Sequence, residues 1–272
     1  MRRLLIRPGG IGDCITCFPV MEWLRADYTE VWVPGMVVPL IQFTNQVRSI
    51  AGTGLDLVGI DGVKAPAILR ETLASFDEIV SWYGSNRTEF HKAARELNER
   101  WRFLPALPPK ESAQHVTDFH AAQVGAPLGM MPHIDVSRMP RCKTIVIHPF
   151  SGGRVKNWPL ANFRALASRL PFPIEWTAGP EELLPEARRF DNLLELAEWI
   201  GGASLYIGND SGITHLAAAV GIPSVGLYNA ANTKVWSARG ERVKCVVRSS
   251  LEEISIEDVM EAVESLLGTK FQ

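Results

Sequence analysis

Three turns rich in glycine and small polar residues carry the side chains best suited to chemistry. They span residues 8–14 (PGGIGDC), 149–158 (PFSGGRVKNW) and 207–215 (IGNDSGITH), and each lies at the end of a short apolar run. In a parallel α/β sheet such turns lie at the carboxyl ends of the strands, where ligands bind. Free backbone N–H groups at a helix start attract anions. The turns therefore predict a ligand that carries phosphate.

The strongest signal is the turn at residues 208–212 (GNDSG), which opens a helix beginning at Ile213. Glycine lets the backbone approach a diphosphate closely, and the helix dipole favours negative charge. The alternative is that Asp210 or Ser211 only caps the helix. His215 lies in the first helical turn, where it either faces the same ligand or is a buried hydrogen-bonding residue.

The second turn, SGG at residues 151–153, follows a strand-like run that ends at His148. Lys156 comes soon after it and can place a point charge on a phosphate. The alternative is a solvated loop lysine. The segment thus predicts a second phosphate contact.

The first turn favours a different role. Its glycines do not have the G-x-G-x-x-G spacing of a dinucleotide-binding turn. Asp13, at the start of the following helix, would repel a diphosphate and suits a base that faces a neutral hydroxyl. The alternative is a helix-stabilising acid in the first turn.

The cysteines do not indicate a metal or redox site. Cys14 and Cys17 have C-x-x-C spacing, but Cys142 and Cys245 are isolated and form no second ligand pair. We interpret the first pair as small hydrophobic residues on a helix face. We expect no metal and no resident cofactor.

A basic and aromatic cluster lies in the first half of the chain. Its members are Trp82, Tyr83, Arg87, His91, Lys92, Arg95, Arg100 and Arg102. The cluster is either a solvated helix face or a place that receives an anionic acceptor.

Apolar strand-like runs alternate with segments of helical spacing along the whole chain, and this order predicts mostly parallel sheets covered by helices. The spacing predicts helices over residues 11–25 and 181–190. Glycines and prolines crowd residues 125–142, so we place a domain boundary there, between domains 1–139 and 140–272. Two similar α/β halves predict a ligand in the cleft between them.

The composition excludes several classes of protein. The 272 residues include 28 Lys and Arg against 30 Asp and Glu, which argues against a dedicated nucleic-acid binder. The chain shows no export signal or membrane segment, and its four cysteines suggest a reducing compartment. We therefore expect a cytoplasmic protein that contacts the inner membrane face through its substrate.

Taken together, the three segments resemble glycosyltransferase family 9, the ADP-heptose:lipopolysaccharide heptosyltransferase family. The similarity rests on RPGGIGD (7–13), SGGRVKNWP (151–159) and GNDSGITHLAAAVGIPSVGLY (208–228). The second half of the chain is similar nearly throughout, whereas residues 27–140 are similar more loosely. The resemblance implies a GT-B fold, in which two Rossmann-like domains face each other across a cleft and the C-terminal one holds the donor.

The resemblance also implies roles for single residues. Asp13 matches the proposed catalytic base, and Lys156 matches the phosphate-binding lysine. Glu181 or Glu182 falls where the family has an acid near the nucleoside ribose. The other residues of the predicted donor site are Gly12, Ser151, Gly152, Asn209, Asp210, Ser211, Gly212 and His215.

The resemblance further implies an inverting glycosyltransferase that needs no catalytic metal. It would move a sugar of the heptose kind from a nucleoside diphosphate, with ADP-heptose as a candidate donor, to a hydroxyl of lipopolysaccharide or another envelope saccharide. The alternatives are an epimerase-like GT-B enzyme that acts on the nucleotide sugar, and a noncatalytic relative that binds nucleotide or saccharide. The chain departs from the family in its compact acceptor side and in Asn229-Ala230, where the family often has Gly-Pro.

Overall fold

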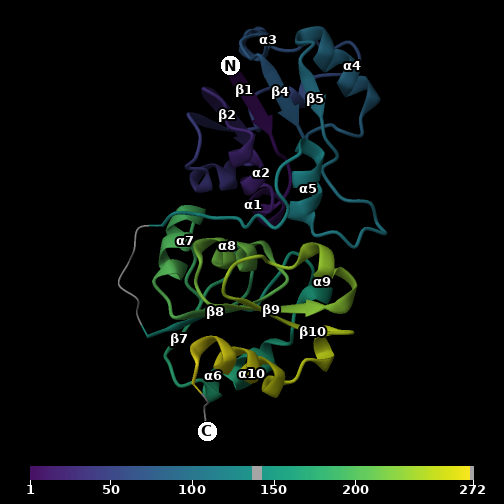
Figure 1. The fold of residues 1–272 in the computed structure, drawn as a ribbon. Helices are drawn as coiled ribbons and strands as arrows, with labels where there is room; N and C mark the ends of the chain where they lie inside the picture. The colour runs from purple at the N-terminus through teal and green to yellow at the C-terminus, as the bar shows by residue number, and fades with distance from the viewer. Residues whose placement is uncertain (137–142, 270–272) are drawn as a thin grey trace. The chain divides into compact units, whose positions relative to one another are not determined.

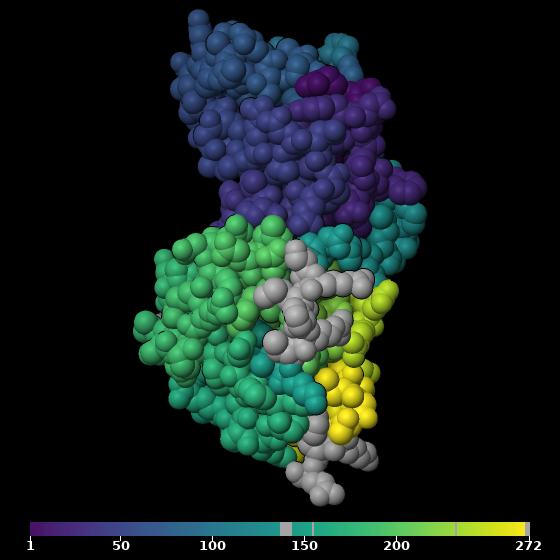
Figure 2. All heavy atoms as spheres, turned by 90° about the vertical axis from the view of Figure 1, so that its left-hand side faces the viewer, coloured from purple at the N-terminus to yellow at the C-terminus, as the bar shows by residue number. Residues whose placement is uncertain are grey.

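A computed structural model describes residues 1–136 and 143–269 of the chain. They divide into two compact units. Unit 1 comprises Met1–Ser112 and Val116–Met130, and unit 2 comprises Ala113–His115 and Met131–Gln272. The atoms of unit 1, purple and blue in the space-filling view, pack closely together, as do the green and yellow atoms of unit 2 (Figure 2). The predicted boundary between residues 139 and 140 lies outside the described residues.

Unit 1 contains a parallel sheet of five strands in the order β3-β2-β1-β4-β5 (Figure 1). The strands are β1 (Arg2–Ile6), β2 (Tyr28–Val33), β3 (Gln46–Ser49), β4 (Glu78–Ser81) and β5 (Trp101–Phe103). The order reverses between β1 and β4, which is the arrangement of a doubly wound fold. The end of β1 therefore lies at the position where such sheets bind ligands.

Helices cover both faces of this sheet. They are α1 (Ile11–Ile15), α2 (Phe18–Trp23), α3 (Ala67–Ala74), α4 (Thr88–Leu97) and α5 (Val116–Val124), with 3-10 helices at Gly35–Leu40 and Leu55–Leu57. Leu4 and Ile6 of β1 pack in one apolar cluster with buried residues of α3 and α4. Leu5 points to the opposite face because side chains alternate along a strand.

The prediction of one continuous helix over residues 11–25 is wrong. The structure has two short helices, α1 and α2, which are broken at Thr16 and Cys17. Pro19 explains the break, because it has no N–H to donate to the carbonyl of Ile15. The backbone N–H groups of Val20 and Met21 bond to Cys17 instead, and a new helix begins there.

Unit 2 contains a second parallel sheet of five strands, in the order β10-β9-β8-β6-β7. The strands are β6 (Ile145–His148), β7 (Ile174–Trp176), β8 (Leu205–Asn209), β9 (Ser224–Asn229) and β10 (Val243–Arg248). Counted within the unit this is the order 2-1-3-4-5, which reverses between β6 and β8. Two of the three sequence turns, at 149–158 and 207–215, adjoin the carboxyl ends of these two strands.

Helices also cover both faces of the second sheet (Figure 1). They are α6 (Leu160–Arg169), α7 (Leu193–Gly201), α8 (Gly212–Val220), α9 (Ala230–Trp236) and α10 (Ile256–Leu267), with 3-10 helices at Arg154–Lys156 and Leu251–Glu253. Ile145 and Ile147 of β6 pack with α6 and α10 in one cluster. The side chains of Val146 and His148 point to the opposite face of the sheet, because side chains alternate along a strand.

The predicted helix over residues 181–190 is wrong. The segment runs as turns, and Arg188 forms an isolated bridge to Thr177 at the edge beyond β7. Pro185 in its middle would remove a helical hydrogen bond and clash with the preceding turn. The segment therefore lies along the sheet edge, where it brings Glu182 back toward the end of β6.

Two glycines of the second sheet make room for tyrosines. Gly208 and Gly226 are paired in register on β8 and β9. A Cβ atom at Gly208 would overlap the phenol oxygen of Tyr206, and one at Gly226 would overlap the ring of Tyr228. Both tyrosines are fully buried. Gly208 therefore serves core packing, which the sequence did not indicate.

Replacing Gly208 with alanine should lower the free energy of unfolding by about 1–3 kcal/mol, the usual cost of overfilling a packed core. Gly152→Ala is the matched control, because nothing lies within 4 Å of a Cβ at that position. Urea unfolding of both variants measures the difference. Equal stabilities of the two variants would show that the Tyr206 ring can move aside at no cost.

Candidate functional site

The carboxyl ends of β6 and β8 lie side by side at the switch point of unit 2. His148, the last residue of β6, is paired in register with Gly208 of β8. The loops that follow, residues 149–158 and 210–211, therefore start from neighbouring positions. In open α/β sheets the crevice at this point is where ligands bind.

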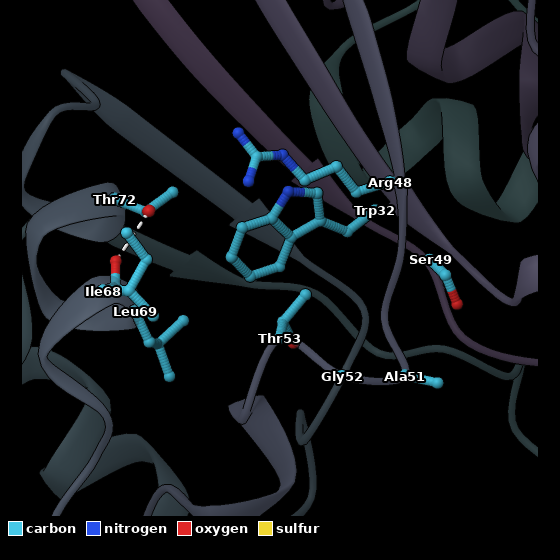
Figure 3. A pocket seen from close by; sticks show the side chains of 9 residues that line it. All are labelled: Trp32, Arg48, Ser49, Ala51, Gly52, Thr53, Ile68, Leu69 and Thr72. Carbon is cyan, nitrogen blue, oxygen red and sulfur yellow. Dashed lines mark hydrogen bonds between the residues drawn. The ribbon is translucent and has the colours of Figure 1, made fainter.

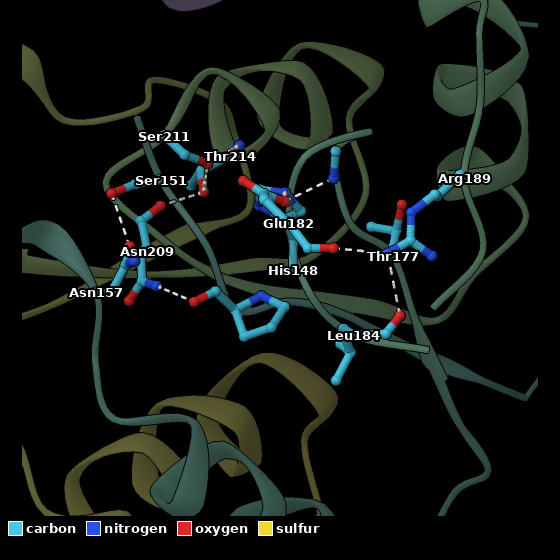
Figure 4. A network of polar contacts seen from close by, with 12 residues as sticks. His148, Ser151, Asn157, Thr177, Glu182, Leu184, Arg189, Asn209, Ser211 and Thr214 are labelled. Atoms are coloured by element: carbon cyan, nitrogen blue, oxygen red, sulfur yellow. Dashed lines mark hydrogen bonds and ion pairs between the residues drawn. The ribbon is translucent and has the colours of Figure 1, made fainter. Parts of the chain in front are cut away.

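A buried asparagine ties the two loops together (Figure 4). The side-chain oxygen of Asn209 accepts from the N–H of Trp158 at 3.0 Å, and its amide nitrogen donates to the carbonyl of Pro149 at 2.8 Å. Asn209 has no exposed surface. Sequence reasoning placed Asn209 among the donor-binding residues. The structure engages both polar atoms of its side chain with protein groups, so we assign it to bracing the site.

The loops bring together the two charged residues of the predicted phosphate site. The Lys156 ammonium lies 2.7 Å from a carboxylate oxygen of Asp210. The Asp210 side chain is 13% exposed and the Lys156 side chain 39% exposed, so the lysine keeps contact with solvent. Ser151 donates to the side-chain oxygen of Asn157 at 2.8 Å, which holds the intervening loop in a tight turn.

Helix α8 begins directly beside this ion pair. Ser211 is its N-cap, and the Ser211 hydroxyl accepts from the N–H of Thr214. The N–H groups of Gly212 and Ile213, at the first helical positions, have no intrahelical acceptor by the geometry of a helix. His215 lies in the same turn and is almost fully buried. The capping prediction for Ser211 is confirmed, and a capped helix start also remains suited to bind an anion.

Of the two candidate acids near the ribose position, the structure builds Glu182 into the site and leaves Glu181 exposed. The Glu182 Oε2 atom accepts from the N–H of Gly179 at 2.6 Å and lies 3.3 Å from His148 Nε2 (Figure 4). Burial alone raises the pKa of this carboxyl, but the hydrogen bonds from His148 and Gly179 lower it more. With the Arg189 charge nearby, the net pKa of Glu182 lies below its ordinary value of 4.5.

Sequence reasoning missed His148 and Arg189 as members of this network. His148 is the final residue of a buried strand, and Arg189 is one of two adjacent arginines in a segment predicted to be helical. Neither has a spacing signal, because both reach Glu182 only through the fold of the 181–190 segment. The one feature of the sequence that could have indicated His148 is its position at the end of an otherwise apolar strand.

Asp13 lies in unit 1, at the start of the short helix α1 just beyond the end of β1. Its Oδ2 atom accepts from the N–H of Gly10 at 2.8 Å. Gly9 has a φ of 120°, and a Cβ there would lie 2.7 Å from the Cβ of Asp13. The turn therefore needs glycine so that the carboxylate can fold back over it. Gly12, which the sequence predicted to bind the donor, lies in this turn of unit 1, whereas the other predicted donor-binding residues lie in unit 2.

Unit 1 also contains a hollow beyond the ends of β2 and β3, next to α3 (Figure 3). Its volume is about 300 Å³, and Trp32, Arg48, Thr53, Ile68 and Thr72 are among its lining residues. Arg48 is the cation of this hollow, but it is paired at 2.7 Å with the buried carboxylate of Glu30.

The aromatic members of the predicted basic cluster pack against the rest of unit 1, and of these Trp82 alone is buried. Trp82 is buried and donates to Gln123, and His91 stacks on Phe103 with ring centroids 3.8 Å apart. Arg87, directly before α4, and Arg95, on α4, are both exposed. The arrangement agrees with the alternative of a solvated helix face.

The cysteines are consistent with a packing role. Cys14 and Cys17 are fully buried, and burial raises the pKa of both thiols to about 12. Cys245 is exposed on β10, and Cys142 lies outside the described residues. Among residues 1–136 and 143–269, no group of three or more His, Cys, Asp or Glu side chains is placed to hold a metal ion.

The two sheets with helices on both faces define an α/β protein of the GT-B class, as predicted, and solved structures of that class superimpose on nearly the whole chain. An ADP-heptose lipopolysaccharide heptosyltransferase II from E. coli has a TM-score of 0.72 at 16% identity, over 98% of both chains. E. coli heptosyltransferase WaaC with ADP has a TM-score of 0.70 at 14% identity, over 97% of this chain and 99% of that one. A family 9 glycosyl transferase from Veillonella parvula has a TM-score of 0.75 at 18% identity, over 98% and 97%.

Residues 182–264 match the model of glycosyltransferase family 9 (heptosyltransferase). This match, over the second half of unit 2, agrees with the resemblance that the sequence motifs indicated. A comparison with curated protein sequences finds no match. Within the described part of the chain, no helix is long and apolar enough to cross a membrane.

The lowered pKa of Glu182 predicts a pH-dependent contribution to stability. The unfolded chain binds a proton to this carboxyl at a higher pH than the folded chain does, so its contribution is present above about pH 4.5 and lost below. Glu182→Gln should therefore be less stable than wild type at pH 7, and the gap should close as the pH falls below 4.5.

Urea unfolding at pH 7, 5 and 3.5 measures this gap. The exposed neighbour provides a matched control, since Glu181→Gln should show no gap at any pH. A gap for Glu182→Gln that stays constant from pH 7 to pH 3.5 would contradict the linkage.

Proposed function

We propose that the chain transfers a heptose-type sugar from a nucleoside diphosphate to a hydroxyl of lipopolysaccharide or another envelope saccharide, with inversion at the anomeric carbon. The observation that carries the proposal is the arrangement at the switch point of unit 2, where Lys156, Asp210 and the start of α8 lie together. Two solved structures of WaaC contain ADP and ADP-2-deoxy-2-fluoro heptose, respectively, and this supports ADP-heptose as the donor class.

The donor diphosphate would bind at the start of α8. The N–H groups of Gly212 and Ile213 and the helix dipole favour a negative group there. Ser151 and Gly152, in the loop tied to β8 by Asn209, would contact the same phosphates, and nothing crowds the backbone at Gly152. His215 would contact the donor from the same helical turn.

Lys156 would neutralise the leaving group. As the bond from sugar to phosphate breaks, charge develops on the diphosphate, and a cation placed beforehand stabilises that charge. Asp210 pairs with Lys156. A bound diphosphate would share this ammonium, and the Asp210 carboxylate would then be available to accept hydrogen bonds from sugar hydroxyls.

Asp13 would act as the base. A sugar hydroxyl has a high pKa, so its proton must leave as the oxygen attacks the anomeric carbon. One carboxylate oxygen of Asp13 is occupied by the Gly10 N–H, which fixes its orientation and leaves the other oxygen to take the proton. The proton then resides on Asp13 while the diphosphate departs with the electron pair of the broken bond, and attack from the opposite face inverts the anomeric centre.

The remaining proposals concern the surroundings of the reaction. We propose that the enzyme is cytoplasmic, contacts the inner membrane face only through its acceptor, and does not bind nucleic acid. We also propose that it uses no resident cofactor besides the nucleotide-sugar substrate.

Asp13 and Lys156 should separate in mutant kinetics. Asp13→Asn can still accept from the Gly10 N–H, so donor affinity should stay within a few-fold of wild type. Turnover should fall by about 10²–10⁴, the usual range for a general base. Lys156→Ala should weaken donor binding and also slow transfer, because its charge matters more as the leaving group forms.

Calorimetric binding of ADP-heptose and initial rates with an acceptor extract measure both effects. Lys244→Ala, an exposed lysine of β10, is the matched control and should change neither. Near wild-type turnover of a folded Asp13→Asn protein would overturn the base assignment. Conversion of the donor without any acceptor would favour an epimerase, and binding without turnover would favour a noncatalytic relative.

Transfer should survive chelation, because a helix start and Lys156 supply positive potential at the diphosphate. Rates measured with and without excess EDTA should agree within about two-fold, given the small role left for a metal. Loss of activity in EDTA that magnesium or manganese restores would overturn this proposal.

A further inference from the structure

We infer that His148 is a positioning residue that holds Glu182 in place to accept hydrogen bonds from both hydroxyls of the donor ribose, and so selects nucleotides with an intact ribose. The inference rests on the proposed function, because it concerns the same donor site. It adds a second layer of residues behind Glu182 that no motif revealed.

The one polar side chain found near the His148 ring among the described residues is that of Glu182. The His148 side chain is 6% exposed, and Nε2 lies 3.3 Å from Glu182 Oε2. Nδ1 is buried and has no hydrogen-bond partner among the described residues. A carboxylate only accepts hydrogen bonds, so the imidazole proton must reside on Nε2. The strand end therefore places one donor atom, Nε2, next to the Glu182 carboxylate (Figure 4).

The two donors to Glu182 converge on a single oxygen. Oε2 lies 3.3 Å from His148 Nε2 and accepts from the Gly179 N–H, whereas no bond to Oε1 is found among the described residues. The Glu182 side chain remains 25% exposed. One edge of the carboxylate is thus anchored, and the other is left open toward solvent.

Arg189 fixes the main chain of the same loop. Its guanidinium donates to the carbonyl of Glu182 at 2.6 Å and to that of Leu184 at 3.2 Å. Arg189 therefore sets the position of the backbone, and His148 sets the direction of the side chain. An acid on a loop without such supports would lose rotamer freedom on binding, which lowers affinity.

The ligand that fits an anchored carboxylate is a pair of adjacent hydroxyls. A ribose 2′,3′-diol offers two donors side by side, and a carboxylate accepts two. The lowered pKa of Glu182 keeps it ionised at neutral pH, so both bonds are charge-assisted and strong. A nucleotide without these hydroxyls would leave the carboxylate unpaired and would bind more weakly.

The test compares ADP with 2′,3′-dideoxy-ADP by calorimetry on the full chain. Wild type should prefer ADP by roughly 10- to 100-fold, the range for losing hydrogen bonds to a charged group. His148→Leu should reduce that preference to within a few-fold, with the affinity for the dideoxy nucleotide unchanged. His148→Gln keeps an N–H at a similar reach and should restore most of the preference.

The kinetic readout separates positioning from folding. His148→Leu should raise the donor KM and leave kcat within a few-fold, because the reacting atoms are untouched. Arg164→Gln is the matched control. Arg164 pairs with Glu186 on the same loop, in an exposed ion pair that does not contact Glu182, and its loss should change neither affinity nor KM.

Each result decides the question. A folded His148→Leu protein that keeps the wild-type preference for ADP overturns the inference, and so does a wild type that binds both nucleotides equally. If the wild-type protein binds neither ADP nor the dideoxy nucleotide, both the inference and the proposed ADP donor are overturned. If His148→Leu does not fold, His148→Asn replaces it. Its amide is too short to reach Glu182, so only His148→Gln should keep the preference for ADP.

Discussion

The donor site depends on the side-chain amide of one buried residue, Asn209. Its two hydrogen bonds join the end of β8 to both ends of the loop that leaves β6, at Pro149 and at Trp158. That loop carries Lys156, and the next residue after Asn209 is Asp210. Without the amide, the N–H of Trp158 and the carbonyl of Pro149 would lack their buried partners, and such orphaned groups cost about 1–3 kcal/mol each.

Two neighbouring features depend on the same brace. Trp158 is buried and donates from its indole to the carbonyl of Ile254, so the loop is fixed at its far end to the segment before α10. Thr214 of α8 donates to the carbonyl of Asn209, which fixes the start of that helix to the strand end. The loop that carries Lys156 and the start of α8 are therefore both hydrogen-bonded to Asn209. These bonds fix the surface that a ligand would contact.

The amino-acid pattern predicts the alternation of strands and helices and the three turns, because these depend on local spacing. It also predicts the two charged residues of the phosphate site, Lys156 and Asp210. It does not predict which way a polar side chain points. Asn209 and Asp210 are adjacent and similar, yet one turns inward to brace and the other pairs with Lys156. It also fails where a proline overrides helical spacing, at Pro19 and Pro185. The turns around Pro185 bring Glu182 to His148, a contact that local spacing does not specify.

The charged side chains of the site are balanced within the protein, and the site can still attract an anion. Glu182 and Asp210 are both acidic, and Lys156 pairs with Asp210, so these side chains alone do not favour a diphosphate. Each acid, however, is already occupied, Asp210 by Lys156 and Glu182 by His148 and Gly179. The attraction that remains comes from the N–H groups at the start of α8, which need no counter-ion and lose none when a ligand arrives. A phosphate can therefore bind to backbone groups first and share Lys156 afterwards, and the lysine, still partly solvated, is free to follow the charge as it develops on the leaving group.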